Sequence, residues 1–153
     1  MSCRLKILCL VTIFLAVCSS GFGQNGEKGR AGQPEAINSV KSSPAFAEVM
    51  LRKADLRSDL ESLLPDYTEQ NPKIIDIRFE LSELDNALDR LFSVKPNELS
   101  KLTLALGKML VRKAGLATEL AHAKRSYNDE HIEVKRLKRR LEAYETAIKE
   151  ILG

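Results

Sequence analysis

Hydrophobic positions recur every three or four residues from about residue 44 to the end of the chain, with charged and polar positions between them. This spacing places the apolar side chains on one stripe of an α-helix. The sequence therefore predicts an all-α protein with four stripes: Phe46, Val49, Lys53, Leu56, Leu60, Leu63; Ile74, Ile77, Leu81, Leu84, Leu88, Leu91; Leu106, Met109, Lys113, Leu116, Leu120, Ala123, Tyr127; and Val134, Leu137, Leu141, Tyr144, Ile148, Ile151.

The same pattern occurs twice, 60 residues apart. Residues 50–92 align with 110–152 without a gap, and several aligned pairs are identical. A fixed period over this length indicates one helical unit used twice. We expect two tandem copies, each an antiparallel helical hairpin or coiled coil, over 44–93 and 97–153. The identical pairs include Arg52 and Arg112, Lys53 and Lys113, Ala54 and Ala114, Leu60 and Leu120, and Tyr67 and Tyr127.

Proline marks the expected helix ends in the first copy. Ser43-Pro44 is typical of a helix start, with serine as N-cap and proline in the first turn. Pro65 and Pro72 bracket a polar stretch that predicts a turn, after which Asn71 caps the next helix. Pro96 and Asn97 predict a short loop over 93–97 before the second copy.

The second copy allows two interpretations. If the second copy repeats the first, residues 128–131 form a turn like the one predicted between Pro65 and Pro72. Local propensity instead allows one continuous helix over about 98–152, roughly 80 Å long at 1.5 Å per residue. Such a long helix needs a coiled partner and predicts oligomerisation.

Lys53 and Lys113 interrupt their stripes at matching places. A polar residue inside a coiled-coil seam lowers stability but can fix the register. Long lysine side chains more often lie at a seam edge with the ammonium group in water. We therefore expect both ammonium groups to be solvated.

The first 23 residues have the pattern of a secretory signal peptide. Arg4 and Lys6 precede a short apolar run, and small residues then lead to a cleavage site before Gln24. An uncleaved anchor, or a lipoprotein modified at Cys18, is the alternative. Residues 24–43 are rich in glycine and serine and predict a disordered spacer.

Removal of residues 1–23 takes away all three cysteines and leaves 22 basic and 21 acidic side chains. A net charge near +1 argues against nucleic-acid binding. The copies differ in charge: residues 46–92 hold six basic and eleven acidic side chains, or −5, and 106–152 hold eleven basic and seven acidic ones, or +4. Opposite charge favours packing of one copy on the other.

The sequence contains no recognisable site for catalysis, a cofactor or a metal. His122 and His131, the only histidines, lack metal-ligand spacing and read as surface or turn residues. Tyr67 and Tyr127 are expected to pack at the hairpin ends, with a binding contact as the alternative. The basic run Lys135, Arg136, Lys138, Arg139 and Arg140 predicts a solvated face that pairs with the acidic first copy, or an attachment point for an anionic envelope surface or polysaccharide.

Residues 67–78 and 127–137 resemble a segment of the periplasmic helical region of polysaccharide chain-length determinant proteins. Those proteins show a tyrosine, a short polar stretch, His-Pro and then a helix. His131 keeps the histidine of that pattern, whereas Ile132 replaces the proline. The resemblance implies a similar extracytoplasmic helical module. It does not extend to the two membrane-spanning helices of that family.

These observations lead to one functional hypothesis and one alternative. The hypothesis is an exported, non-enzymatic helical interaction or scaffold protein of the cell envelope, an accessory to polysaccharide export in its sharpest form. It would bind a protein partner, or self-associate, through its helical seams. The alternative is a periplasmic holdase-type chaperone.

Overall fold

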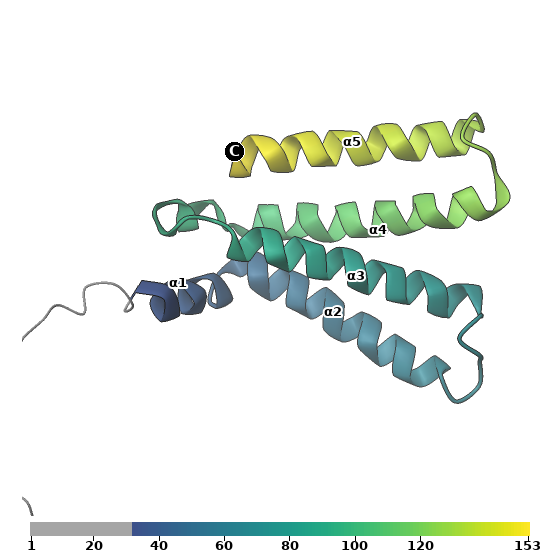
Figure 1. The fold of residues 1–153 in the computed structure, drawn as a ribbon, viewed down its shortest axis with the longest axis horizontal. Helices are drawn as coiled ribbons and strands as arrows, with labels where there is room; N and C mark the ends of the chain where they lie inside the picture. Colours follow the sequence, from purple (N-terminus) through teal and green to yellow (C-terminus); the bar gives the residue numbers. More distant parts are fainter. Residues whose placement is uncertain (1–31) are drawn as a thin grey trace, which may run out of the picture.

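The structure, a computed structural model, describes residues 32–153. No strand occurs within this range, so the predicted all-α class is confirmed. Figure 1 shows the long helices lying beside one another, with a short helix at the end where the described chain begins. The elements are α1 (Gly32–Lys41), α2 (Pro44–Leu63), α3 (Pro72–Phe92), the 3-10 helix η1 (Pro96–Lys101), α4 (Leu104–Ser126) and α5 (Ile132–Leu152).

The helices of the first half begin where the prolines predicted. The hydroxyl of Ser43 accepts a hydrogen bond from the Phe46 N–H at 3.2 Å, and the side chain of Asn71 accepts one from the Lys73 N–H at 2.9 Å. Each cap is followed by a proline, whose missing N–H costs nothing in the first turn. The predicted turn between Pro65 and Pro72 lies between α2 and α3.

The second half begins later than predicted. The sequence predicts a short loop over 93–97 followed directly by a helix, but residues 96–101 form η1 and α4 begins at Leu104. Leu102 is buried in the core, and the Thr103 hydroxyl then accepts a hydrogen bond from the Leu106 N–H at 3.3 Å. Burial of this leucine therefore shifts the helix start to the next residue that can cap.

The continuous-helix alternative is wrong. Tyr127 has an extended backbone, with φ −128° and ψ 147°, and it separates α4 from α5. The Asn128 side chain accepts the Glu130 N–H at 3.2 Å, and the His131 ring accepts the Glu133 N–H at 3.3 Å. These side chains replace helical hydrogen bonds locally, so the helix stops without a proline.

The predicted disordered spacer is wrong over its described part, because Gly32–Lys41 form α1. Val40 of α1 is 3% exposed and belongs to the hydrophobic core. Burial of this side chain offsets part of the cost of ordering a polar segment. The predicted signal peptide and residues 24–31 of the spacer lie outside the described residues.

Helix α4 is the centre of the packing. It contacts α2, α3 and α5, whereas α5 packs chiefly on α4. The predicted stripes supply most of the core, but α4 also buries Gly107, Leu110 and Ala114, which lie outside its predicted stripe. A helix covered from several sides needs a wider apolar face than a single seam. The largest fully buried side chains are Ile74, Leu84, Leu91, Leu102, Leu106, Leu110, Leu116, Ile148, Val49 and Val134.

Both halves keep the 60-residue spacing of the sequence in their helix starts. Pro44 and Leu104 begin α2 and α4, and Pro72 and Ile132 begin α3 and α5. The interpretation as two tandem copies of one hairpin stays a prediction.

Helices α2 and α4 approach each other closely at Gly107. A Cβ atom at this position would lie 2.9 Å from the Cα and carbonyl oxygen of Ala45 and 2.9 Å from the Cβ of Glu48. The Ala45 N–H also donates to the Leu102 carbonyl at 3.3 Å, which ties the two helix starts together. Only glycine fits this contact without moving a backbone.

Gly107→Ala should lower the free energy of unfolding by about 1–3 kcal/mol, because the added methyl group meets backbone atoms that cannot rotate away. Gly115→Ala is the matched control, since a Cβ there has no neighbour within 4 Å. The control should gain about 0.5–1 kcal/mol from helix propensity. Urea unfolding followed by circular dichroism measures both, and equal shifts would contradict the close contact.

The expectation that Lys53 is solvated is wrong. Its side chain is 5% exposed, and its ammonium group forms an ion pair with Asp85 of α3. The same arrangement recurs in the second half, where the Lys113 Nζ lies 3.0 Å from Glu145 of α5. Lys53 is therefore a buried seam residue, and the carboxylate that neutralises its charge lies at the exposed edge of the seam.

Asp85→Asn should destabilise the fold by about 1–3 kcal/mol, because it leaves the buried Lys53 ammonium without its counter-charge. Asp89→Asn, one turn further along α3, is the control: Asp89 is exposed and has no ion pair within residues 32–153. The comparison uses thermal and urea unfolding at neutral pH. Equal stability of the two variants would show that the ion pair contributes nothing.

Candidate interaction surface

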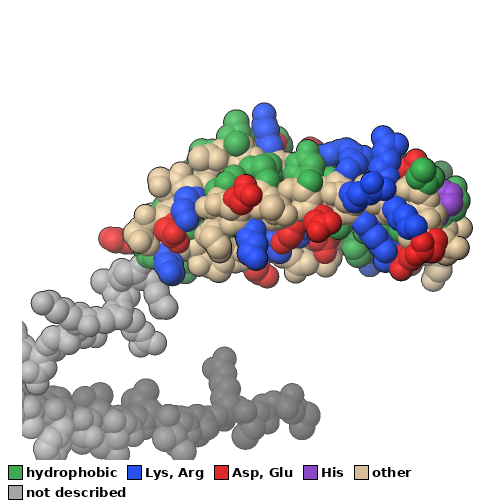
Figure 2. Space-filling model, turned by 90° about the horizontal axis from the view of Figure 1, so that it is seen from above, with side chains coloured by type: hydrophobic (Ala, Val, Ile, Leu, Met, Phe, Trp, Pro, Cys, Tyr) green, Lys and Arg blue, Asp and Glu red, His purple; other side chains and the backbone are tan. Residues whose placement is uncertain are grey.

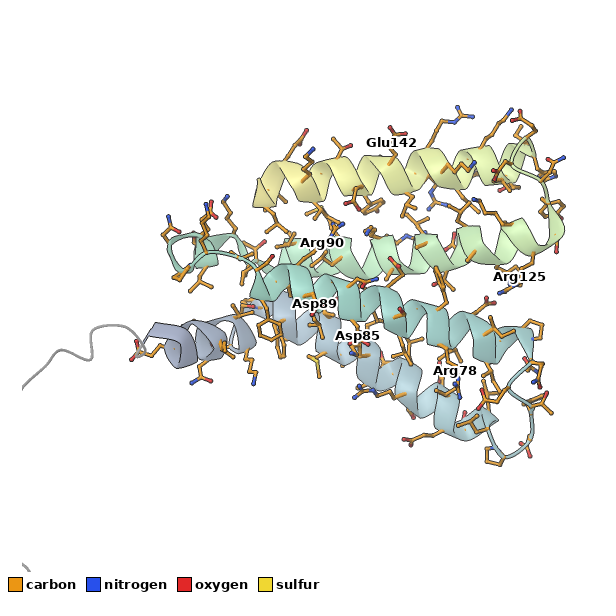
Figure 3. All side chains as sticks on the ribbon, in the orientation of Figure 1. Arg78, Asp85, Asp89, Arg90, Arg125 and Glu142 are labelled. Carbon is orange, nitrogen blue, oxygen red and sulfur yellow. The ribbon has the colours of Figure 1, made fainter. Side chains whose placement is uncertain are left out.

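An open groove with a volume of about 580 Å³ runs along α4 between α3 and α5. We call it the α3–α5 groove. Its floor consists of Ala117, Leu120 and Ala121 of α4, and Leu141 of α5 and Phe79 of α3 extend the apolar lining. Phe79 is 38% exposed. Figure 3 labels Arg90 on the α3 side and Glu142 on the α5 side of the groove.

The floor of the groove departs from the repeat. Sixty residues earlier, Arg57 and Glu61 stand where the second half has Ala117 and Ala121. Two long charged side chains are thus replaced by methyl groups on the outward side of α4. Methyl groups at these two positions fill less space than long charged side chains would, and they keep the floor of the groove apolar.

An ion-pair network closes one end of the groove. Glu145 lies 2.7 Å from the Arg90 guanidinium and 3.0 Å from the Lys113 ammonium, and Lys113 also lies 3.9 Å from Glu83. Partial burial raises the pKa of Glu145, but the hydrogen bonds from Arg90 and Lys113 outweigh it, so that its pKa lies below the usual value. These charges join α3, α4 and α5 at one point.

Two lysines mark the other end. Lys124 of α4 and Lys138 of α5 lie 3.4 and 3.1 Å from Asp129, which sits in the turn between their helices. Hydrogen bonds from Lys138 and Lys124 lower the pKa of Asp129 below its usual value. One carboxylate therefore faces two ammonium groups, and this end of the groove carries net positive charge.

A second ionic contact joins α3 to α4 near the far end of the bundle. Asp76 accepts from the Arg125 guanidinium and lies 2.8 Å from the Nδ1 atom of His122. The basic second half meets the acidic first half here and through Lys113 and Glu83. The predicted electrostatic attraction between the halves thus acts through these residues.

Both tyrosines singled out by the sequence lie in turns. Tyr67 is 50% exposed between α2 and α3, and Tyr127 is 48% exposed between α4 and α5. The Tyr127 ring stacks on His131, with ring centroids 3.9 Å apart. His131 lies in a turn and His122 is exposed, as predicted. Neither tyrosine lines the α3–α5 groove.

Within the chain the basic run pairs with acids of the second half, so the predicted pairing with the first half of the same chain is wrong. Figure 2 shows lysine and arginine side chains gathered at one end of the face that α5 forms. Lys135 pairs with Glu130, Arg136 lies 3.6 Å from Glu133, and Arg140 lies 4.0 Å from Glu119. Arg139 donates to the carbonyl of Lys135 at 3.4 Å. Because α5 packs chiefly on α4, the acids within reach of the run belong to the second half.

Sequence reasoning missed the groove and its ionic end. The signal was present: a shift of 60 residues carries Lys53 onto Lys113 and also Asp85 onto Glu145, a pair of opposite charges kept in both halves. Taken alone, the alanines of the floor give no signal, because small residues on a helix usually indicate only close packing.

Residues 32–153 contain no cluster of histidine, cysteine and carboxylate side chains that could hold a metal ion. None of the helices in that range is both long and apolar enough to span a bilayer. No family model matches the chain, and no curated protein or solved structure shows significant similarity to it.

The low pKa of Glu145 predicts an acid-sensitive contribution to stability. A carboxylate with a depressed folded pKa stabilises fully above its unfolded pKa of about 4.3 and loses this contribution as the pH falls through the folded value. Glu145→Gln should therefore be less stable than the natural chain at pH 6, and the gap should shrink towards pH 3.

Glu142→Gln is the control for this experiment, because Glu142 is exposed and has no ion pair within the described helices. Urea midpoints at the two pH values measure the gap. A gap that stays constant from pH 6 to pH 3 would exclude the proposed linkage.

Proposed function

We propose that this chain is an exported, non-enzymatic helical scaffold protein of the cell envelope, whose binding surface is the α3–α5 groove. The observation that carries the proposal is the apolar floor of that groove, which α3, α4 and α5 leave uncovered. Open apolar grooves between helices are a common way to receive an amphipathic helix. Burial of the floor would contribute about 25 cal/mol for each Å² removed from water.

The charged ends of the groove support a role in recognition. In the network around Glu145 the positive and negative charges are equal in number. At the other end, Lys124 and Lys138 share the single carboxylate of Asp129. A ligand helix would thus meet a neutral end and a positive end. Such asymmetry fixes the direction in which a helix binds more than it increases affinity.

The chemistry of the lining supports binding over catalysis. The floor offers methyl groups and aliphatic chains, and the nearest carboxylate with a perturbed pKa, Glu145, is shifted towards the ionised form by two cations. A general acid near neutral pH requires the opposite shift.

Export and envelope location rest on the sequence. Residues 1–23 have the pattern of a signal peptide, and residues 67–78 and 127–137 resemble the periplasmic helical region of polysaccharide chain-length determinant proteins. An accessory role in polysaccharide export is the most specific form of the proposal.

A photo-crosslinking experiment tests the proposal in cells that make the full chain. A photoreactive amino acid replaces Leu120 on the groove floor or, as control, Ala143 on the exposed side of α5. We expect the chain in an extracytoplasmic fraction, shortened at its N-terminus, with one discrete protein adduct for position 120 and none for position 143.

Two results would contradict the scaffold proposal. An unprocessed chain that stays in the cytoplasm would exclude export. A broad smear of adducts from position 120, together with suppression of client aggregation by the purified chain, would instead favour the holdase-type chaperone.

A further inference from the structure

We propose that the occupant of the α3–α5 groove is helix α2 of a second copy of the same chain. This inference rests on the proposed scaffold function and names its partner. It follows from a second uncovered feature of the molecule, the outward side of α2, which matches the groove in length and belongs to the acidic half of the chain.

The outward side of α2 carries a stripe of small and apolar residues at helical spacing. Ala47, Leu51, Ala54 and Ser58 follow one another at steps of four, three and four, and all are exposed. Leu51 is 60% exposed, although it lies in the middle of a regular helix. We call these four residues the α2 stripe. Steps of this kind form the contact face between packed helices.

The stripe and the groove have the same length. Ala47 and Ser58 are eleven residues apart, as are Lys113 and Lys124, which mark the groove ends on α4. Both distances correspond to roughly 16 Å at 1.5 Å per residue. The small floor residues Ala117 and Ala121 allow a helix to approach closely, and Leu51 is the one large side chain of the stripe that could fill the space between them.

The charges are complementary. Asp55 and Glu61 flank the α2 stripe on its two sides, and neither has an ion pair within residues 32–153. The groove presents Lys124 and Lys138, which share only Asp129. Acidic side chains of α2 from another copy would face these two lysines at that end. The two halves of the chain are also opposite in charge, with −5 over 46–92 and +4 over 106–152, so the first half of one copy attracts the second half of another.

The geometry makes this contact head-to-tail. The α2 stripe and the groove are different surfaces, so one copy offers a helix while the next offers a groove. Within one chain α2 already packs on α3 and α4 through its inner side. Such a heterologous contact continues from copy to copy and produces a closed ring or an open filament.

The experiment uses two variants that each block one surface. Leu51→Arg disrupts the stripe and leaves the groove intact, whereas Ala121→Arg fills the groove and leaves the stripe intact. Ala143→Arg, on the exposed side of α5 and outside the groove, is the control. Helix content and thermal midpoints by circular dichroism show that each purified, processed chain is folded.

Sedimentation velocity over a range of concentrations then gives the state of association. The natural chain and the Ala143→Arg control should form oligomers that grow with concentration and weaken in high salt. Each blocking variant alone should be a monomer. An equimolar mixture of Leu51→Arg and Ala121→Arg should form a one-to-one dimer and nothing larger, because one intact stripe meets one intact groove.

Three outcomes would overturn the inference: a natural chain that stays monomeric at all concentrations, a blocking variant that is folded and still assembles like the control, or a mixture that stays monomeric. The proposed function fails separately. A discrete crosslinked adduct from Leu120 that contains a different protein would preserve the scaffold role and exclude a second copy as the occupant.

Discussion

The contact between the starts of α2 and α4 determines how the two halves of the molecule meet. Gly107 lies against the backbone of Ala45, and the hydrogen bond from Ala45 to Leu102 fixes the same point. Close packing there brings the inner face of α2 onto α4 and directs α3 to its neighbouring side. Everything further along the bundle, including the ionic contact between Asp76 and Arg125, depends on that starting geometry.

Ion pairs are used in a consistent way throughout the bundle. Lys53 and Lys113 stand within apolar seams, and each reaches a carboxylate on the adjacent helix, Asp85 or Glu145. A lysine with a long apolar stem can pack inside a seam when its charge is met at the edge. Apolar burial dominates the energy, since each fully buried leucine or isoleucine contributes roughly 1.5–3 kcal/mol. The ion pairs mainly determine which faces meet.

The sequence predicted the helices well because apolar periodicity and proline caps are local signals. Ser43-Pro44 and Asn71-Pro72 mark helix starts in both the sequence and the structure. Long-range effects were harder to predict. Burial of Leu102 moved the start of α4, and burial of Val40 ordered a segment whose composition favours disorder. Neither contact can be seen in a window of neighbouring residues.

The α3–α5 groove was the least predictable part of the structure. The basic run at 135–140 is conspicuous in the sequence, yet four of its five cations form ion pairs within their own half, and the fifth, Arg139, donates to the carbonyl of Lys135. The groove instead depends on alanines at 117 and 121, whose meaning appears only when α3 and α5 stand on either side. A small side chain is informative only when it can be compared with a larger one at an equivalent position. Here the comparison is with Arg57 and Glu61, which lie 60 residues before the two alanines.

Helix α5 rests chiefly on α4 and supplies one entire wall of the groove. An element supported from a single side is the natural candidate for sub-global opening, in which one cooperative unit exchanges with solvent while the remainder stays native. The α3–α5 groove thus exists only while this last helix is docked. Any ligand that bridges α3 and α5 would stabilise the docked form, so that binding and the ordering of the C-terminal helix become thermodynamically linked.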